Sequence, residues 1–271
     1  MTNSFNLYHQ LLAKSAKELQ SFTKNSPTHE SQFTFTTFNE NCVDVIYDDL
    51  GKKNLISPRQ ELFEKIPGLG DTCKGCYRYF MSPRNRSAKF LDIKLGKKFE
   101  TYFVDFLNSI GIPSDLLDKK PLNYPDIIIK NHQGEIVSRC EIKYMAAPFL
   151  LLYKKVEGRE CYEGSNTLDV GKKIAKQREF VENDIDVPVF YIYWLDYPCI
   201  KGIYYMSAKD VYAYIDSVGG KQFERKERTG DFVTTEDGTK KKISQTSKVY
   251  LPLYKMNNFE NLISEFQRLI K

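Results

Sequence analysis

The sequence predicts an α/β protein with a mixed central sheet flanked by helices and with additional segments at both ends of the chain. Three observations predict this class. Residues 124–145 alternate around a polar turn, as expected for a β-hairpin. Residues 187–195 (VPVFYIYWL) are apolar at successive positions, which is typical of a central strand buried on both faces. Residues 87–110 and 168–182, before and after the hairpin, have the pattern of helices.

The chain has 271 residues, of which 41% are hydrophobic and 14% aromatic, so a sizeable core can form. No apolar run approaches the roughly 20 residues of a membrane-spanning helix. The start (MTNSFNLYHQ) lacks the basic and apolar regions of a secretory signal. We therefore expect a cytoplasmic protein without a membrane partner. The net charge of +5, from 40 basic and 35 acidic residues, permits a nucleic-acid partner without requiring one.

The N-terminal region is expected to be mostly helical. Apolar residues at helical spacing predict a helix over 5–22, and a capping box with proline in the first turn predicts another over 57–66. A further helix is expected over 41–50. Residues 31–38 (SQFTFTTF) alternate between apolar and polar residues and predict a strand.

The hairpin brings charged side chains together. Asp126 follows Pro125 and begins the apolar run DIIIK, and the turn NHQG separates this run from the second strand. In that strand Glu141 and Lys143 share one face, whereas Cys140 points to the opposite face and is expected in the core. Two carboxylates and an ammonium are costly to hold together on one hairpin, and a divalent cation would relieve the repulsion between the acids. An ordinary surface hairpin with an exposed Glu-x-Lys pair is the alternative interpretation.

Pro125-Asp126 followed by Glu141-Ile142-Lys143 resembles the PD-(D/E)xK signature of metal-dependent nucleases, and the gap between the two parts matches the hairpin of that family. The resemblance covers about residues 88–217, where the expected order of elements agrees with an αβββαβ core. The first strand of that core would lie within 112–124, where two prolines weaken the strand pattern. The implied fold is a PD-(D/E)xK, or restriction-endonuclease-like, core.

The resemblance implies roles for these residues. Asp126 and Glu141 would bind Mg²⁺, with the backbone carbonyl of Ile142 as a candidate further ligand. Lys143 would orient or deprotonate the attacking water and stabilise the developing charge. Glu100 would add a carboxylate from the preceding helix to the metal site, or would be an ordinary solvated glutamate. Hard oxygen ligands suit Mg²⁺, with Mn²⁺ as a substitute, and disfavour turnover with Ca²⁺.

In the resemblance, the helix over 168–182 is the second core helix and packs on the sheet. Some members of the family place Lys or Gln there near the metal or the phosphate, which makes Lys173 and Gln177 candidates for contact with nucleic acid. A strand over 202–206 and a helix that begins after Ser207 are expected to follow.

Cys73 and Cys76 have the Cys-x-x-Cys spacing that can bind zinc. A structural zinc site needs four ligands and the chain has no second such pair, so we do not expect bound zinc. The six cysteines give no disulfide framework, and a redox pair would lack its usual βαβ setting. The loop that follows mixes aromatic residues with Arg78, Arg84 and Arg86, which could contact DNA or belong to a solvated connector.

The C-terminal part is basic over 221–242, and Glu236-Asp237-Gly238-Thr239 predicts a hairpin turn. A basic β-ribbon could lie along DNA, although a charged surface hairpin has the same pattern. We expect contact with DNA because the neighbouring core implies such a substrate. The candidates are Arg225, Lys226, Arg228, Lys240 and Lys241. A strand over 248–255 and a helix over 259–270 complete the chain.

Together these features predict a Mg²⁺-dependent, sequence-specific double-stranded DNA endonuclease, most similar to a type II restriction enzyme. Residues 1–86 would form a mostly helical region with a DNA-contact loop, 87–218 the nuclease core, and 219–271 the basic hairpin and closing helix. A homodimer is expected, because a two-fold symmetric protein matches a palindromic site. The resemblance also implies a companion DNA methyltransferase.

Three alternatives follow from the same residues. The first is a repair or junction-resolving nuclease of the same fold. The second is a non-catalytic DNA-binding protein stiffened by zinc, which would hold one equivalent of that metal tightly. The third is an unrelated α/β protein with a chance motif, which would not bind DNA at low salt.

Overall fold

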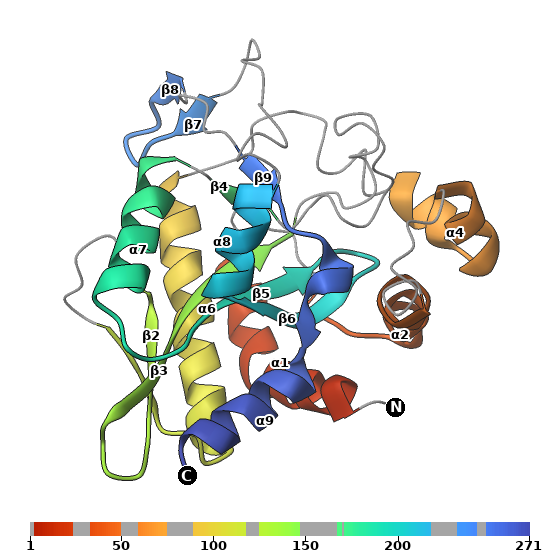
Figure 1. Cartoon of the computed structure of the whole chain (residues 1–271). Helices are drawn as coiled ribbons and strands as arrows, with labels where there is room; N and C mark the ends of the chain where they lie inside the picture. The colour runs from red at the N-terminus through yellow and green to blue at the C-terminus, as the bar shows by residue number, and fades with distance from the viewer. Residues whose placement is uncertain are drawn as a thin grey trace.

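The computed structural model describes most residues of the chain (Figure 1). They are residues 3–23, 33–49, 59–74, 89–117, 125–146, 167–169, 171–217, 232–242 and 248–271.

A mixed six-stranded sheet lies at the centre, in the order β1-β2-β3-β5-β6-β10. Strands β3 and β5 run parallel, and the other neighbours run antiparallel. The strands are β1 (Ser114–Leu116), β2 (Ile127–Lys130), β3 (Ile136–Met145), β5 (Val189–Asp196), β6 (Lys201–Ser207) and β10 (Asn257–Asn258). This arrangement confirms the predicted α/β class, and β1 lies within the range expected for the first core strand.

Strands β2 and β3 form the predicted hairpin. Ile127 pairs with Cys140, and the register shifts between Ile129 and Lys130. Oδ1 of Asn131 accepts hydrogen bonds from the backbone of Gln133 and Glu135 at 3.0 and 2.9 Å, which stabilises the turn. Gly134 follows with φ 87°, a left-handed conformation that favours glycine.

Every residue of β5 is buried, which confirms the predicted central strand. Helix α7 (Lys172–Asn183) precedes β5 and supplies the crossover that a parallel β3–β5 pair requires. Strand β6 then returns antiparallel to β5, after a turn in which the Tyr197 amide donates to the Ile200 carbonyl at 3.0 Å.

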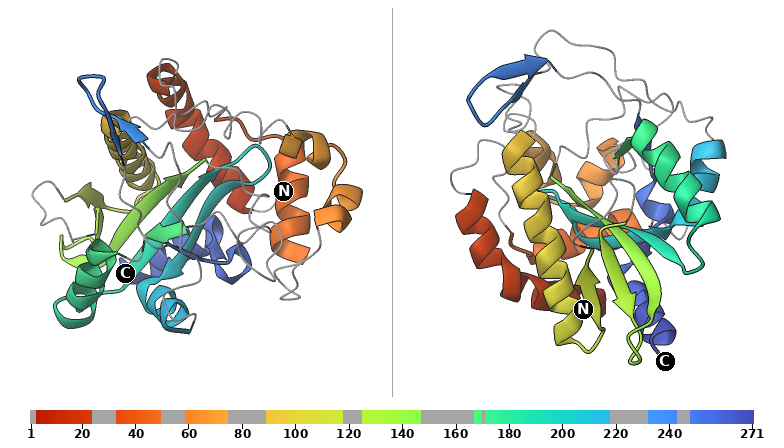
Figure 2. Two further views of the ribbon diagram at one scale, coloured as in Figure 1. Left: turned by 90° about the horizontal axis from the view of Figure 1, so that it is seen from above. Right: turned by 90° about the vertical axis from the view of Figure 1, so that its left-hand side faces the viewer.

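Helices α1 (Asn3–Thr23) and α6 (Lys89–Ser109) cover one face of the sheet (Figure 2). The ring of Phe99 on α6 lies 4.7 Å from that of Trp194 on β5. Helix α9 (Phe259–Leu269) adds Phe266, whose ring lies 5.9 Å from that of Phe190, also on β5. Alternate residues of β5 thus pack against helices from both ends of the chain.

Helices α7 and α8 (Ala208–Ser217) cover the opposite face (Figure 2). The hydroxyl of Ser207 accepts a hydrogen bond from the Asp210 amide at 3.0 Å, so Ser207 is the N-cap expected from the sequence. The two faces of the sheet therefore have separate helical layers, and the parity of a strand residue decides which layer its side chain meets.

Smaller elements surround this core. They are α2 (Thr37–Val43), the π-helical segment η1 (Asp44–Asp49), α4 (Arg59–Lys65), the β4–β9 pair (Thr167–Asp169 with Lys248–Tyr250), the β7–β8 hairpin (Phe232–Thr234 with Lys240–Lys242) and the 3₁₀ turn η4 (Leu253–Lys255). The β7–β8 turn contains Gly238 at φ 80° and confirms the hairpin predicted there.

The strand predicted over 31–38 is wrong for the residues that the structure describes, 33–38. Phe33 has φ 40°, which an extended strand does not allow, and α2 begins at Thr37. Oδ1 of Asn39 accepts a hydrogen bond from the Thr36 amide at 3.1 Å. This capping contact starts a helix where the alternation of phenylalanine and threonine suggested a strand.

Three predicted elements have different bounds. The helix expected over 41–50 begins four residues earlier, as α2, and continues as η1. Residues 167–169 form β4 instead of helix, so α7 begins at Lys172. The strand expected over 248–255 ends at Tyr250, since Pro252 lacks the amide donor that a continuing ladder needs.

Candidate functional site

Asp126 comes directly before β2, and Glu141 lies within β3, the partner strand of the hairpin. Ile127 pairs with Cys140, and the same register carried one residue further sets Asp126 opposite Glu141. The Asp126 carbonyl accepts a hydrogen bond from the Leu117 amide at 3.1 Å, so the backbone pairing with the β1 side continues through this position. Residues opposite each other in an antiparallel pair project to the same face. Asp126 is 9% exposed and Glu141 is 2% exposed, so both residues are largely buried.

Lys143 is the third residue of the predicted site. Its ammonium lies 3.0 Å from Oε1 of Glu141, two residues earlier on the same face of β3. The Lys143 side chain is 24% exposed, compared with 3% for that of Glu141. The lysine therefore reaches toward solvent, while the carboxylate that it contacts lies inside the protein.

Gln177 of α7 contacts the other oxygen of Glu141. Its amide donates from Nε2 to Oε2 of Glu141 at 3.1 Å, and Gln177 is 1% exposed. The sequence suggested Gln177 as a nucleic-acid contact. In the structure Gln177 is buried beside Glu141, and its contact with nucleic acid stays a prediction. Both oxygens of Glu141 accept hydrogen bonds, one from Lys143 and one from Gln177.

Two tyrosines continue this chain of hydrogen bonds. The Tyr191 hydroxyl donates to Oε1 of Gln177 at 2.7 Å and lies 3.0 Å from the Tyr212 hydroxyl. Tyr191 has one hydroxyl proton, which Gln177 accepts, so Tyr212 is the donor in the second contact. Burial raises the pKa of both tyrosines above their ordinary value, and Tyr212 and Glu141 raise that of Tyr191 further. Both groups are therefore neutral donors at physiological pH.

Helix α8 is held against α7 by Arg178, next to Gln177. Its guanidinium donates two hydrogen bonds to the Asp216 carboxylate, at 2.7 and 2.9 Å, and one to Glu182 at 2.8 Å. The guanidinium carbon also lies 5.3 Å from the centre of the Tyr212 ring. These contacts fix α8, and with it Tyr212, relative to the helix that carries Gln177.

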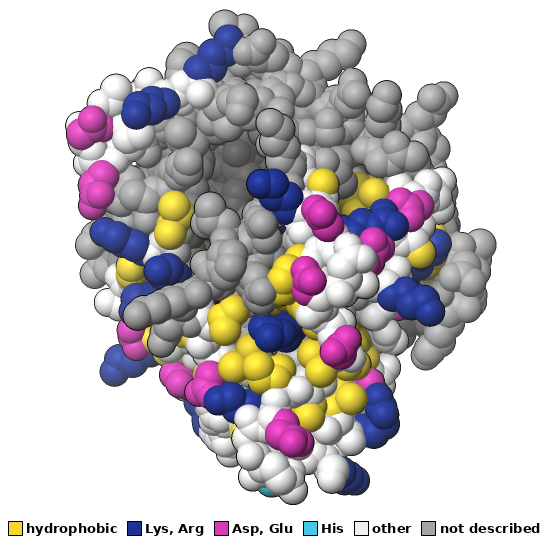
Figure 3. Space-filling view, turned by 60° about the vertical axis from the view of Figure 1, so that its left-hand side comes forward, with side chains coloured by type: hydrophobic (Ala, Val, Ile, Leu, Met, Phe, Trp, Pro, Cys, Tyr) yellow, Lys and Arg dark blue, Asp and Glu magenta, His cyan; other side chains and the backbone are white. Residues whose placement is uncertain are grey.

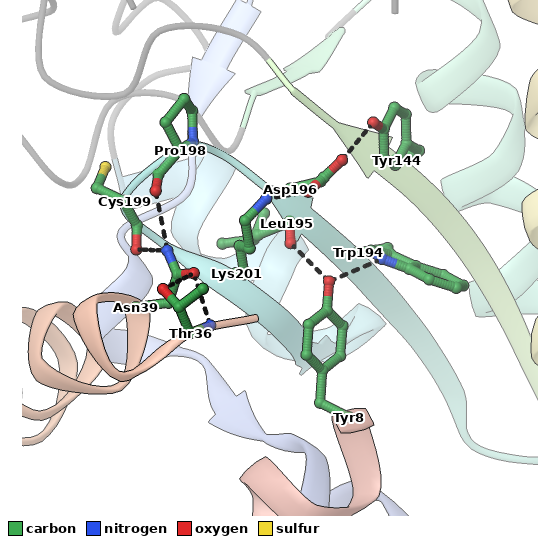
Figure 4. Close-up of polar contacts among 10 residues, drawn as sticks. All are labelled: Tyr8, Thr36, Asn39, Tyr144, Trp194, Leu195, Asp196, Pro198, Cys199 and Lys201. Atoms are coloured by element: carbon green, nitrogen blue, oxygen red, sulfur yellow. Dashed lines mark hydrogen bonds and ion pairs between the residues drawn. The ribbon is translucent and has the colours of Figure 1, made fainter. Parts of the chain in front are cut away.

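A second buried polar cluster lies on the opposite face of the sheet (Figure 4). Asp196, at the end of β5, forms an ion pair with Lys201, at the start of β6, and both residues are buried. Oδ2 of Asp196 accepts a hydrogen bond from the Tyr144 hydroxyl at 2.8 Å. Nearby, Tyr8 accepts a hydrogen bond from the Trp194 indole at 3.2 Å. No pattern in the sequence predicted this cluster.

Glu100 lies on α6. The neighbouring Phe99 stacks on Tyr144, so α6 packs on the face opposite to the one that carries Glu141. No group of three or more His, Cys, Asp and Glu side chains suited to a metal occurs among the described residues. Glu100 is thus not gathered with Asp126 and Glu141 into a three-carboxylate site, and its metal role stays a prediction.

The oxygen atoms of Asp126, Glu141 and the Ile142 carbonyl are of the type that binds a hard divalent cation. Asp126 and Glu141 supply carboxylates from adjacent strands, and the Ile142 carbonyl belongs to the residue after Glu141. Carboxylate and carbonyl oxygens suit Mg²⁺ and Mn²⁺. Each Glu141 oxygen keeps a second lone pair for a cation, so the hydrogen bonds from Lys143 and Gln177 can persist when a cation binds.

The predicted DNA contacts are only partly described. Lys240 and Lys241 are exposed on β8, and Lys94 of α6 lies 3.6 Å from Glu236 in the β7–β8 turn. On the face drawn in Figure 3, basic and acidic side chains are interspersed over the described residues. The structure places the backbone of Lys173 in the first turn of α7. Arg78, Arg84, Arg86, Arg225, Lys226, Arg228 and Cys76 lie outside the described residues, whereas Cys73 is described and half-buried.

Tyr191 and Tyr212, which connect Gln177 to α8, were not among the residues predicted from the sequence. A signal for Tyr191 was present. A tyrosine within a strand that is apolar on both faces must bury its hydroxyl, and a buried hydroxyl needs a hydrogen-bond partner. Tyr191 lies in such a strand, in register with Glu141 on β3.

The chain matches no protein-family model, and no curated protein matches it either. Among the described helices, none is both long enough and apolar enough to cross a membrane.

Proposed function

We propose that this protein is a Mg²⁺-dependent endonuclease that hydrolyses phosphodiester bonds in double-stranded DNA. The observation that carries the proposal is the register that sets Asp126 opposite Glu141, with Lys143 on the same face of β3 and 3.0 Å from Glu141. Two acids and a lysine from adjacent strands are the groups that metal-assisted phosphodiester hydrolysis uses.

The order of elements supports the same proposal. Helix α6, the meander β1-β2-β3, helix α7 and strand β5 occur in this order along the chain, with the short β4 between β3 and α7, and β5 lies parallel to β3. This order is compatible with the αβββαβ core that the resemblance of the motif to PD-(D/E)xK nucleases implies. The order of elements adds to the motif, because it involves α6, α7 and β5 as well as the hairpin that carries the motif residues.

The chain's own residues would share the chemistry. A divalent cation bound by Asp126 and Glu141 would stabilise the negative charge on the phosphate. The Lys143 ammonium, which reaches further toward solvent than Glu141, would orient the attacking water or stabilise charge that develops in the transition state. Gln177 would keep Glu141 in a fixed orientation.

The finer proposal is sequence-specific cleavage, as in a type II restriction enzyme. Such an enzyme would act as a homodimer on a palindromic site and would be accompanied by a DNA methyltransferase that protects the host site. The exposed lysines of β8 are the described residues that we propose for contact with the DNA backbone.

The test is cleavage of a long, sequenced, unmethylated DNA in the presence of Mg²⁺. We expect Asp126→Asn and Lys143→Met each to reduce the rate at least about 100-fold, because each removes a group that acts at the phosphate. Lys130→Met is the matched control, since Lys130 on the same hairpin pairs with the exposed Asp115 at 2.6 Å. Discrete fragments would support sequence-specific cleavage, and a smear would support a nuclease without a defined site. Absence of cleavage with both Mg²⁺ and Mn²⁺, or equal cleavage by Asp126→Asn, would contradict the proposal.

A further inference from the structure

We propose that Tyr191 is a positioning residue that orients Glu141 for cation binding by fixing the amide of Gln177. This inference rests on the proposed function, because it concerns the same carboxylate. It adds two residues, Tyr191 and Tyr212, that belong to neither the sequence motif nor the hairpin.

The Glu141 carboxylate is held by two neighbouring side chains. A glutamate side chain has three rotatable bonds, so its oxygens need contacts that hold them in one orientation. Lys143 contacts Oε1, but the lysine is itself long and partly exposed. Gln177 contacts Oε2 at 3.1 Å from a buried position on α7, and is the more rigid of the two partners.

The Gln177 amide can present either its NH₂ group or its oxygen to Glu141. Only the NH₂ group stabilises an ionised carboxylate, which is a pure acceptor. Tyr191 selects this orientation, because its hydroxyl donates to the Gln177 oxygen at 2.7 Å. With the amide reversed, the oxygen would face the Glu141 carboxylate and the tyrosine would face a donor.

The hydroxyl proton of Tyr191 also has a defined direction. Tyr212 lies 3.0 Å from the Tyr191 oxygen, and since the Tyr191 proton is used in the bond to Gln177, Tyr212 is the donor of this contact and holds the Tyr191 hydroxyl from its other side. Tyr212 belongs to α8, which Arg178 holds against α7. The orientation of Glu141 thus depends on a chain of hydrogen bonds that runs from α8 through β5 and α7 to β3.

The test compares Mn²⁺ binding by the full chain, followed by electron paramagnetic resonance of the free ion, with the Mg²⁺ dependence of DNA cleavage. The variants are Tyr191→Phe, Tyr212→Phe and Glu141→Gln, and Tyr205→Phe is the control. Tyr205 is also a buried tyrosine of the sheet, but it lies on β6 and packs against Phe190 on the opposite face. Circular dichroism and thermal denaturation confirm that each variant is folded.

We expect Tyr191→Phe to weaken Mn²⁺ binding about 10- to 100-fold, as loss of an indirect metal-site contact typically does. Tyr212→Phe should have a smaller effect, because Tyr191 can still donate to Gln177. High Mg²⁺ should restore most of the maximal cleavage rate of Tyr191→Phe, which a general loss of structure would not allow. Tyr205→Phe should bind Mn²⁺ as the unmodified protein does.

The outcomes separate this inference from the proposed function. If Tyr191→Phe binds Mn²⁺ normally while Glu141→Gln does not, the positioning role is overturned and the metal site stands. If both variants weaken Mn²⁺ binding but the protein never cleaves DNA, the positioning role is supported and the nuclease proposal fails. If Glu141→Gln binds Mn²⁺ normally, both are overturned. A larger loss in Tyr212→Phe than in Tyr191→Phe would also overturn the order of the hydrogen-bond chain.

Discussion

The Tyr144 hydroxyl donates a 2.8 Å hydrogen bond to Oδ2 of Asp196, which joins the end of β3 to the end of β5. The Tyr144 ring also stacks on Phe99 of α6, with ring centres 3.8 Å apart. Tyr144 follows Lys143 directly, and the two side chains point to opposite faces of β3. These contacts therefore anchor, from behind, the part of the strand that presents Lys143 to the candidate site.

Tyr144→Phe should reduce the free energy of unfolding by about 1.5–3 kcal/mol, because the lost donor serves an ionised acceptor. Tyr47→Phe is a matched control, since the Tyr47 hydroxyl donates at 2.8 Å to a neutral acceptor, the Met256 carbonyl. Its loss should be about 1 kcal/mol. Urea denaturation measures both values, and an equal loss in the two variants would contradict a specific role for Asp196 as the acceptor.

The buried pair formed by Asp196 and Lys201 predicts a non-additive result. Lys201→Met should destabilise the protein by about 3–5 kcal/mol, because it leaves a buried carboxylate without its cation. The double variant Asp196→Asn with Lys201→Met should be more stable than Lys201→Met alone, since the uncompensated charge is gone. Equilibrium denaturation of both single variants and the double variant completes the cycle. A double variant no more stable than Lys201→Met would show that loss of packing, and not charge, causes the effect.

Local patterns predicted the hairpin and its charged face. The register shift between Ile129 and Lys130, which sets Asp126 opposite Glu141, had no signal in the sequence. By contrast, alternation within one strand decides that Glu141 and Lys143 share a face, and the Asn131–Gly134 turn joins the two strands. The shared face and the turn depend on residues that are close in the chain, so both could be predicted from the sequence.

The supporting contacts could not be predicted in the same way. Gln177 reaches Glu141 only because the α7 crossover lies on the Glu141 face of the sheet, and Asp196 meets Lys201 only because the turn after β5 is tight. Such partners are decided by the packing of distant segments. The strand predicted over 31–38 is wrong for a local reason. The capping contact between Thr36 and Asn39 favours the start of a helix, although the alternating pattern indicated a strand.

Asn39 connects this N-terminal segment to the sheet. We therefore expect a small change in its side chain to have a large effect on stability. Its amide nitrogen donates to the Pro198 and Cys199 carbonyls, each at 2.9 Å, in the turn between β5 and β6 (Figure 4). Asn39→Asp would place a carboxylate oxygen against two carbonyl oxygens at a buried site. We expect a loss of about 3 kcal/mol or more at neutral pH.

The control for Asn39→Asp is Asn41→Asp, the same substitution at an exposed position of the same helix, which should change stability by less than about 0.5 kcal/mol. Chemical denaturation at neutral pH measures both variants. Part of the loss in Asn39→Asp should be recovered at low pH, where a protonated carboxyl can donate to one carbonyl. Equal stability of the two variants would contradict the role assigned to the Asn39 amide.

The Arg178–Asp216 ion pair predicts a pH dependence. Hydrogen bonds from Arg178 lower the pKa of the Asp216 carboxyl below its ordinary value. A carboxylate whose pKa is lowered by folding stabilises the protein at pH values above its unfolded pKa, about 3.9, and this contribution disappears as the pH falls through the lower folded value. Arg178→Met should therefore raise the pKa of Asp216 toward the ordinary value and make acid unfolding less dependent on this group.

Carbon-13 NMR titration of the Asp216 carboxyl measures this change. Arg268→Met is the matched control, because Arg268 lowers the pKa of Glu265 on α9 in the same way. It should raise the pKa of Glu265 and leave that of Asp216 unchanged. An unchanged Asp216 pKa in Arg178→Met would show that the bidentate contact does not persist in solution. The contact that holds α8 against α7, on which the position of Tyr212 depends, would then be lost as well.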